Sequence, residues 1–346
     1  MKIAIVGAGW YGCHLANLLR QIGLDVTIFE RNSSVFTGAS GKNQNRLHLG
    51  FHYARDYTTR MQSRDGFSRF IERYPTLSTP ISTNLYAIPK GDSLIDFRTY
   101  KSIMASTGIE FEEGDRTQHS VEGLTRISGV INTNERLVET NRAAGFFQAK
   151  LSDILRFDTP ITNDDIREYD NRVEIFGESF DYLLDATWGK LTQIDIDTFY
   201  EPTLLLYYRS KRPDWALTMV DGPLCSIYPT DEDGIVTLSS VPHTPLGSFS
   251  QVAEAEAFLE NVSDDFVQAK RVLFEDQIRA YFPHFDDIYS YEGPQFSMKT
   301  KPVGAEDSRA CYVFQKRRIF SVMSGKIDTI FVAAEKIISG IGKSLY

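Results

Sequence analysis

Three glycines near the start of the chain have the spacing of a turn that binds a dinucleotide. Gly7, Gly9 and Gly12 follow the apolar run 2–6 and precede a helical pattern over residues 13–20. The first glycine permits a tight turn, the second lets a diphosphate approach the backbone, and the third lets the helix pack on the strand. The N-terminus of that helix offers N–H groups and a partial positive charge to phosphates. The spacing therefore predicts a dinucleotide-binding turn.

An acidic residue stands where the second strand of such a fold should end. Residues 25–29 have the pattern of a strand, and Glu30 follows them directly. A carboxylate at this position accepts hydrogen bonds from ribose hydroxyls, and it repels a 2′-phosphate, which argues against NADP. The glycine turn and Glu30 together leave both NAD and FAD open as the bound dinucleotide.

Composition excludes several other classes of protein. The chain has 346 residues, which is enough for two domains, and its net charge of −9 disfavours a nucleic-acid partner. It has no apolar run of membrane-spanning length, and the first strand begins at Lys2, which leaves no room for a signal peptide, so we expect a cytoplasmic protein. The three cysteines, Cys13, Cys225 and Cys311, lack the paired spacing of a disulfide framework or a metal site, so we expect no metal. The oligomeric state stays open.

Elements of a nucleotide-binding fold recur at the start, in the middle and at the end of the chain, around a module rich in β-strands. A polar, glycine-containing loop over residues 32–45 follows the second strand, although such a loop can also be merely solvated. A recurrence of this kind fits a flavin fold better than a contiguous nicotinamide-binding half. The patterns predict helices over 58–74, 92–107, 135–155, 250–281 and 324–339, and strands over 85–88, 171–189 (two strands and a turn), 203–209, 224–228, 235–239 and 318–323, with a turn at 231–234.

Taken in order, these segments resemble the D-amino-acid oxidase superfamily of FAD-dependent oxidoreductases, which includes glycine oxidase, sarcosine oxidase and 2-hydroxyglutarate oxidase. The segments that carry the resemblance are the glycine turn through Glu30, residues 45–50, residues 180–189 and residues 325–327. Two departures stand out. Trp188 precedes Gly189 where the family usually has small residues, and the last strand lacks the usual glycine-rich continuation.

The resemblance implies an α/β fold of two domains. One is a discontinuous Rossmann-like FAD-binding domain, formed by residues 1–75, 120–195 and 295–346. The other is an inserted β-rich α+β substrate domain, formed by residues 76–119 and 196–294.

The resemblance also implies which residues hold FAD. The glycine turn, Glu30 and Arg31 would bind its ADP half, and the polar loop would line the diphosphate and the flavin edge. The predicted cofactor-binding residues are Gly7, Gly9, Trp10, Tyr11, Gly12, Glu30, Arg31, Ser40, Gly41, Asn45, Arg46, Leu47, Ala186, Thr187, Gly189, Gly325, Lys326 and Ile327.

At the substrate end, Arg46, His48 and Tyr207 are the predicted catalytic residues. Arg46 would clamp a carboxylate through paired hydrogen bonds. His48 would touch the flavin, orient the substrate or link covalently to the cofactor, although a packed, hydrogen-bonded histidine is an equally good reading. Tyr207 and Tyr208 are neighbours on a strand, so only one of them can face the flavin.

Four further side chains have weaker claims to a role. Cys311 resembles the cysteine that tethers flavin in sarcosine oxidases, although most buried cysteines are inert. Lys299, Lys301 and Lys326 fall where a cation would stabilise reduced flavin or assist the reaction with oxygen, although surface lysines are commoner.

The resulting prediction is an FAD-dependent oxidoreductase that transfers a hydride to flavin N5 from a C–H bond next to an amine or hydroxyl of a small substrate. Three alternatives stay open: an NAD-dependent dehydrogenase, a flavoenzyme acting on a sugar or nucleotide-sugar, and a non-catalytic flavin-binding protein. Flavin absorbance of the purified protein distinguishes a flavoenzyme from an NAD-dependent dehydrogenase. Flavin reduction by amines, hydroxy acids or sugars distinguishes the other two alternatives from the main prediction. The sequence defines neither the substrate nor the electron acceptor.

Overall fold

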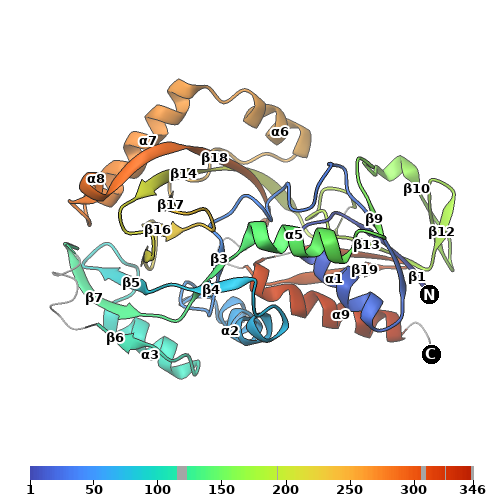
Figure 1. The fold of residues 1–346 in the computed structure, drawn as a ribbon, viewed down its shortest axis with the longest axis horizontal. Helices are drawn as coiled ribbons and strands as arrows, with labels where there is room; N and C mark the ends of the chain where they lie inside the picture. Colours follow the sequence, from blue (N-terminus) through green and yellow to red (C-terminus); the bar gives the residue numbers. More distant parts are fainter. Residues whose placement is uncertain (115–122, 193, 305–308, 324, 344–346) are drawn as a thin grey trace. The chain divides into compact units, whose positions relative to one another are not determined.

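The computed structural model describes residues 1–114, 123–192, 194–304, 309–323 and 325–343, which form two compact units (Figure 1). Unit 1 comprises Met1–Gly41, Thr140–Thr198 and the described residues from Thr300 onward, and unit 2 comprises Lys42–Glu139 and Phe199–Lys299. Residues 42–75, 123–139 and 295–299 thus belong to unit 2, whereas the sequence assigned them to the FAD-binding domain; residues 196–198, assigned to the substrate domain, belong to unit 1. Compactness does not say which residues bind a cofactor, so that assignment stays a prediction. The predicted boundary between residues 119 and 120 lies outside the described residues.

Unit 1 is built on a six-stranded sheet with the order β19-β20-β13-β1-β2-β9. Neighbouring strands are parallel except for the antiparallel pair β19–β20. The central strand β1 is apolar on both faces because the sheet is covered on both sides. The strands are β1 (Lys2–Val6), β2 (Asp25–Phe29), β9 (Leu155–Arg156), β13 (Tyr182–Asp185), β19 (Tyr312–Lys316) and β20 (Ile319–Met323).

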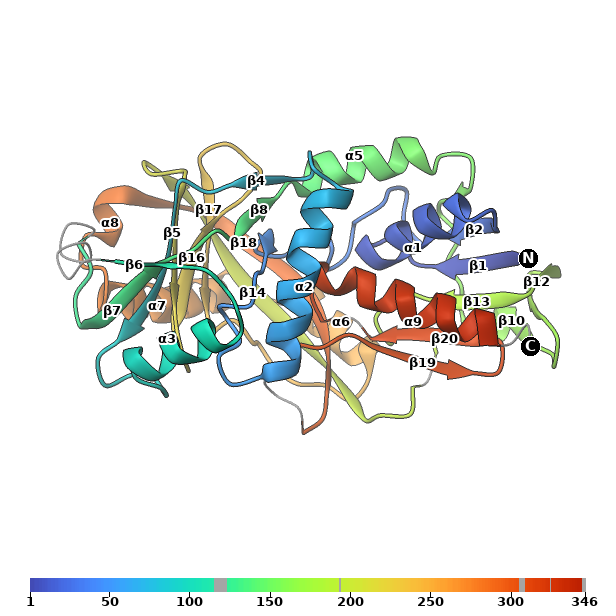
Figure 2. The same cartoon turned by 90° about the horizontal axis from the view of Figure 1, so that it is seen from below.

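Helices pack beside this sheet, and α1 lies against α9 (Figure 2). A small antiparallel sheet, β10-β11-β12, precedes β13 in the chain. Because parallel strands return from the middle and the end of the chain, the predicted discontinuous Rossmann-like fold is confirmed. The remaining elements of unit 1 are α1 (Trp10–Gln21), α5 (Thr140–Lys150), η1 (Asn163–Asp165), β10 (Ile166–Glu168), β11 (Val173–Ile175), β12 (Glu178–Phe180), η2 (Ile327–Thr329) and α9 (Ile330–Lys343).

Unit 2 is built on an eight-stranded sheet with the order β18-β14-β17-β16-β15-β5-β7-β6 and a small sheet with the order β3-β8-β4. This is the β-rich module that the sequence predicted. The large sheet contains β5 (Thr83–Pro89), β6 (Glu112–Glu113), β7 (Ile127–Asn132), β14 (Thr198–Ser210), β15 (Trp215–Met219), β16 (Cys225–Pro229), β17 (Ile235–Ser240) and β18 (Tyr289–Pro302); the small one contains β3 (Arg46–Leu47), β4 (Ser78–Pro80) and β8 (Arg136–Val138).

One face of the large sheet is apolar. Strand pairing aligns Leu206, Leu238, Ile227, Leu217 and Leu85 in a row across five strands. These side chains are buried in one core cluster, which the helices α7 (Asp264–Arg279) and α8 (Phe285–Ile288) help to complete (Figure 1). We call this side of the sheet the apolar face.

The opposite face of the same sheet carries polar side chains. Tyr207 pairs with Thr237, which pairs with Tyr228, while Thr218 on the next strand pairs with Tyr86. Because side chains alternate along a strand, this row points away from the apolar face. We call this side, defined by these five residues, the polar face.

Helices α2 and α3 of unit 2 begin where the sequence supplies a capping side chain. Asp56 accepts a hydrogen bond at the start of α2 (Tyr57–Arg73), and Asp96 does so at the start of α3 (Phe97–Ser106). Helix α6 (Val252–Glu260) precedes α7, so residues 250–281 are mostly helical as predicted. Within the part of the chain that the structure describes, no helix is both long and apolar enough to cross a membrane.

Four sequence predictions are wrong in detail. Residues 171–189 form three strands rather than two, because β11 and β12 pair with each other before β13 joins the main sheet. Residues 135–155 do not form one helix, because 136–138 pair as β8 with β3 and β4, and the helix α5 starts at Thr140. The helix predicted over 92–107 begins only after Asp96, which caps it. The last helix starts at Ile330, after the short turn η2, and Ser324 of the predicted span lies outside the described residues.

Candidate active site

The glycine turn of unit 1 has no room for side chains. Gly7 has φ of +99°, in the left-handed region that glycine adopts freely, and a Cβ there would lie 3.0 Å from the Ala186 carbonyl oxygen. A Cβ on Gly12 would overlap the carbonyl oxygen of Gly7, so only glycine lets α1 pack this close to the turn. Gly9 is the N-cap of α1, and a Cβ there would lie 2.7 Å from Ser40 Oγ.

The N-terminus of α1 faces this turn with no side-chain cap from Gly9 and no acidic residue in its first turn. Ser40 Oγ accepts a hydrogen bond from the Trp10 N–H at 2.9 Å, so the polar loop approaches the helix N-terminus. The other first-turn N–H groups have no intrahelical acceptor by the geometry of a helix. This arrangement suits a diphosphate, which needs N–H donors and a partial positive charge.

Glu30 is fixed beside the same turn. Its Oε2 accepts a hydrogen bond from the Ala8 N–H at 2.8 Å, and its Oε1 accepts two from Asn32, one from the backbone N–H and one from the side chain, both at 3.0 Å. The side chain is buried, so its orientation is defined. A carboxylate has about four acceptor positions, which leaves capacity for a ribose hydroxyl. Arg31, predicted to help bind the ADP half, is exposed.

Two more predicted segments converge on this turn, because the C-terminal ends of parallel strands meet at one edge of a sheet. The loop after β13 is held by Asp185, whose Oδ1 accepts from the Thr187 N–H (2.8 Å) and hydroxyl (2.6 Å). The Tyr11 hydroxyl donates to the Lys326 carbonyl oxygen at 2.7 Å, which ties α1 to the segment before η2. Gly189 and Ile327 lie in these same loops, and Gly325 cannot carry a Cβ, because it would overlap the Arg309 carbonyl oxygen.

Unit 1 therefore fits the ADP portion of FAD. The glycine turn, the N-terminus of α1 and the oriented Glu30 provide the donors and acceptors that a diphosphate and a ribose require. Of the residues predicted for this end, the structure brings together Gly7, Gly9, Trp10, Gly12, Glu30, Ser40 and Ala186, and it packs Gly41 against the Phe36 carbonyl.

Unit 2 holds a buried arginine on the polar face. Arg46 is 5% exposed, donates from Nη1 to Thr218 Oγ1 at 2.7 Å, and lies over the Tyr228 ring with Cζ 4.1 Å from its centroid. Its Nε and Nη2 are also buried and have no hydrogen-bond partner among the described residues. Asn84 Oδ1, in the same region, is another buried acceptor without a partner there. Such orphaned polar atoms are costly unless water or a ligand satisfies them.

A histidine and a glutamate lie beside Arg46. His48 is buried, its Nδ1 is 3.5 Å from Glu135 Oε2, and its ring contacts those of His52 and Tyr53, with centroids 5.7 and 5.5 Å away. Glu135 Oε2 also accepts a hydrogen bond from the Tyr86 hydroxyl at 2.6 Å, and its Oε1 accepts one from the Leu49 N–H at 2.7 Å.

The electrostatics of Glu135 follow from these contacts. Burial raises its pKa above the ordinary value, while the Tyr86 hydrogen bond, the backbone donors and the Arg46 charge act in the opposite direction. Burial, together with the Glu135 charge, also raises the pKa of Tyr86, so that phenol stays protonated. The cluster thus combines a cation, an acid and an imidazole in a dry environment.

Sequence reasoning missed Glu135, because residues 135–155 were interpreted as a helix and a lone acidic residue carries no signal. It also missed Asn84 and Thr218. Their polar roles depend on strand register across β5 and β15, which no local pattern defines.

Other predicted residues of unit 2 take different places. Tyr207 lies on the polar face, where Gln295 Nε2 donates to its hydroxyl, and burial raises its pKa. Asn45 donates from Nδ2 to Asp231 Oδ1 at 2.8 Å, and Leu47 is fully buried in β3. Tyr208 points to the apolar face instead, as strand alternation requires.

For the four side chains with weaker claims, a role beside the flavin stays a prediction. Lys299 and Lys301 lie on β18, and Lys326 precedes η2. Cys311 is buried, and burial raises the pKa of its thiol to about 12, which disfavours the thiolate that a covalent flavin link would need.

Comparison with known proteins identifies the family to which this chain belongs. Residues 2–293 match the model of the FAD-dependent oxidoreductase (DAO) family. The chain is 49% identical over 340 residues to the FAD-dependent monooxygenase FPY4 of Fusarium mangiferae, covering 98% of this chain and 90% of that protein. It is 25% identical over 366 residues to the FAD-dependent monooxygenase kojA of Aspergillus flavus, covering 98% and 85%.

Solved structures show the same fold. L-α-glycerophosphate oxidase from Mycoplasma pneumoniae with FAD bound aligns with a TM-score of 0.73 at 13% identity, over 96% of this chain and 92% of that one. Glycine oxidase from Geobacillus kaustophilus aligns with a TM-score of 0.72 at 14% identity, over 97% and 93%.

A flavin-type α/β fold with a dinucleotide turn and an attached β-rich unit defines the class as a flavoenzyme. The chain belongs to the FAD-dependent oxidoreductase (DAO) family, its cofactor is FAD, and it is an oxidoreductase. The predicted family, fold class and cofactor are thus confirmed. The nicotinamide-dependent and non-catalytic alternatives are not favoured.

Proposed function

We propose that the enzyme oxidises a small, carboxylate-bearing substrate at a C–H bond next to an amine or a hydroxyl group. The observation that carries this proposal is the Arg46 guanidinium, which is buried with two nitrogen atoms unsatisfied among the described residues. A carboxylate offers two oxygens in the geometry that a guanidinium binds in a bidentate manner. We therefore assign Arg46 as the substrate anchor.

The surrounding side chains would complete the substrate site. Thr218 and Tyr228 fix the guanidinium from one side and from its face, so little entropy is lost when a carboxylate binds. His48 is the candidate to receive a proton from the substrate amine or hydroxyl, and Tyr207 on the same face is a candidate contact. Asn84 Oδ1 would accept a hydrogen bond from the polar part of the substrate.

We further propose that unit 1 holds FAD through the residues at its glycine turn, with Glu30 on the ribose and the N-terminus of α1 on the diphosphate. FAD supplies a two-electron acceptor for the hydride that leaves the substrate C–H bond. The contribution of the protein is to hold the substrate, to neutralise its charge and to accept the proton.

Anaerobic mixing tests the substrate class. Purified holoenzyme is mixed with amino acids, 2-hydroxy acids, their primary amides, simple amines and sugars, and flavin absorbance at its visible maximum is recorded. We expect bleaching by carboxylate-bearing amines or hydroxy acids. Bleaching by sugars or by uncharged amines alone would overturn the assignment of Arg46 as an anchor.

A second function is favoured by one observation. The relative that is 49% identical bears the name monooxygenase, which implies that one oxygen atom of O₂ enters a product. Turnover under ¹⁸O₂ with mass spectrometry distinguishes the two. Label in the product supports oxygenation, whereas stoichiometric hydrogen peroxide without label supports simple oxidation.

The cytoplasmic location expected from the sequence and the absence of a nucleic-acid partner remain proposals. Fractionation of the source cells with an antibody tests the first, and a filter-binding assay with DNA and RNA tests the second.

A further inference from the structure

Glu135 belongs to no motif of the chain, yet it is the most enclosed acidic side chain beside the proposed anchor. We propose that Glu135 is a positioning residue: it orients His48 through Nδ1 and readies that imidazole to take a proton when an anion occupies Arg46. This inference rests on the proposed function for the nature of the anion, but the pairing of Glu135 with His48 stands on geometry alone.

The two side chains lie within ion-pair distance of each other, and both are buried. Glu135 Oε2 is 3.5 Å from His48 Nδ1, and the side chains are 0% and 4% exposed, so water does not screen their interaction. Glu135 cannot swing away, because Tyr86 donates to Oε2 and the Leu49 N–H donates to Oε1. Leu49 directly follows His48 in the chain, so one carboxyl group fixes both the backbone and the ring at this point.

The net charge of the cluster couples anion binding at Arg46 to protonation of His48. Arg46 is cationic and Glu135, when ionised, is anionic, so the cluster is neutral while His48 is neutral. A bound carboxylate adds one negative charge, and protonation of His48 restores neutrality. In a dry site an uncompensated charge is expensive, so anion binding should raise the proton affinity of His48.

Three phenols around the pair, those of Tyr86, Tyr100 and Tyr228, do not change this count at neutral pH. The neighbouring phenols have a raised pKa because they are buried, and they stay neutral. Asp221 is paired with Arg55. The titratable and charged groups acting on the cluster are Arg46, His52, Tyr53, Tyr86, Tyr100, Asp221 and Tyr228.

The proton step balances without any further reagent. An amino-acid substrate enters with a protonated amine, and the amine must be neutral before a hydride leaves the adjacent carbon. The substrate N–H bond breaks, an N–H bond forms at His48 Nε2, and the electron pair stays on the substrate nitrogen. Glu135 does not accept or donate a proton in this step. Its negatively charged carboxylate faces His48 Nδ1 and stabilises the imidazolium that forms.

The test is a direct titration of His48 in the holoenzyme. Histidines are labelled with ¹³C at Cε1, the His48 signal is assigned by its loss in His48→Asn, and its pKa is measured from the NMR shift between pH 5 and pH 9. We expect Glu135→Gln to lower the pKa of His48 by about 1–3 pH units, because a nearby opposite charge is removed. An unchanged pKa would overturn the inference.

Matched variants exclude a general effect of substitution. Glu139→Gln makes the same chemical change four residues away and should leave the pKa of His48 unchanged. Tyr86→Phe is milder. It removes one donor that favours the ionised carboxylate of Glu135, so it should lower the pKa of His48 by a smaller amount. If Glu135→Gln does not fold, which melting temperature and FAD content reveal, the Tyr86→Phe result decides.

Acetate serves as the anion probe and separates this inference from the proposed function. In wild-type holoenzyme, acetate should raise the pKa of His48, and in Arg46→Met it should not. A Glu135→Gln shift without any acetate effect supports the pairing and overturns the anion site at Arg46. An acetate effect without a Glu135→Gln shift supports the anion site and overturns the role of Glu135.

Discussion

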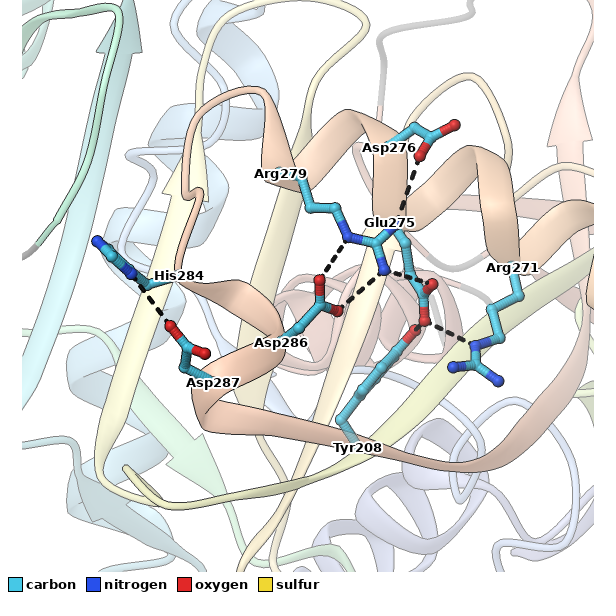
Figure 3. A network of polar contacts seen from close by, with 8 residues as sticks. All are labelled: Tyr208, Arg271, Glu275, Asp276, Arg279, His284, Asp286 and Asp287. Carbon is cyan, nitrogen blue, oxygen red and sulfur yellow. Dashed lines mark hydrogen bonds and ion pairs between the residues drawn. The ribbon is translucent and has the colours of Figure 1, made fainter.

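Two buried glutamates lie on opposite faces of the eight-stranded sheet, and their surroundings differ. On the apolar face, Glu275 of α7 accepts hydrogen bonds from Tyr208 Oη at 2.8 Å, Arg271 Nε at 2.6 Å and Arg279 Nη2 at 2.9 Å (Figure 3). Arg279 in turn binds both carboxylate oxygens of Asp286, at 2.7 and 2.9 Å. The carboxylate of Glu275 is thus fully paired within its own unit.

Glu135 on the polar face has a different set of partners. It accepts from a phenol and a backbone N–H, and an imidazole that can change charge lies 3.5 Å from it. The cation of the cluster, Arg46, keeps two nitrogens unsatisfied among the described residues. A fully paired buried charge holds α7 in place, whereas an incompletely paired cluster leaves polar capacity for a ligand.

The largest expected effect concerns the stability that Glu275 provides. Glu275→Ala removes the acceptor of the Tyr208 hydroxyl and of Arg271, while Arg279 keeps Asp286. We therefore expect the free energy of unfolding to fall by about 2–4 kcal/mol in urea denaturation. Asp276→Ala, at the exposed neighbour, should change it by less than about 0.5 kcal/mol. Equal effects would mean that the network does not stabilise the unit.

A matched pair of tyrosines sharpens the contrast. Tyr208→Phe and Tyr86→Phe each remove a hydroxyl that donates to a buried glutamate, and each should cost about 1–3 kcal/mol of stability. Only Tyr86→Phe should also move the acidic limb of the pH profile of kcat/KM, toward lower pH. A shift of that limb in Tyr208→Phe would remove the distinction between the two faces.

The pH dependence of stability gives the smallest effect. Burial raises the pKa of Glu135 in the folded state, so the folded protein binds that proton more tightly than the unfolded chain. Its stability relative to Glu135→Gln should therefore be greatest below the unfolded pKa. It should then fall as pH rises toward the folded pKa, by about 1.4 kcal/mol per pH unit at most. Urea denaturation at pH 4, 5, 6 and 7 checks this, and a difference that does not vary with pH would contradict it.

The cofactor end could be predicted from the sequence because its chemistry is local and made by the backbone. Gly7, Gly9 and Gly12 stand within six positions of one another, and their need for glycine follows from one turn and one helix. Glu30 follows the next strand directly. No long-range packing was needed to relate these residues.

The substrate end could be predicted only in part. Arg46 and His48 drew attention as near neighbours in the sequence, but Glu135, 87 positions after His48, reaches them through the β3–β8 pairing. Thr218 of the large sheet meets Arg46 of the small sheet across 172 positions, a contact that no local pattern defines. Local propensity also failed at residues 136–138, where pairing with two short strands outweighed a helical pattern.

The most direct test of the account compares an acid with its amide in wild type and in Arg46→Met. For a substrate that bleaches the flavin, the rate of anaerobic flavin reduction is measured with the free acid and with the primary amide, at equal FAD content. We predict that wild type prefers the acid by about 10–100-fold, as a charged hydrogen-bonded pair of 1.5–3 kcal/mol implies, and that Arg46→Met loses this preference. A preference that survives in Arg46→Met would contradict the claim that Arg46 anchors the substrate.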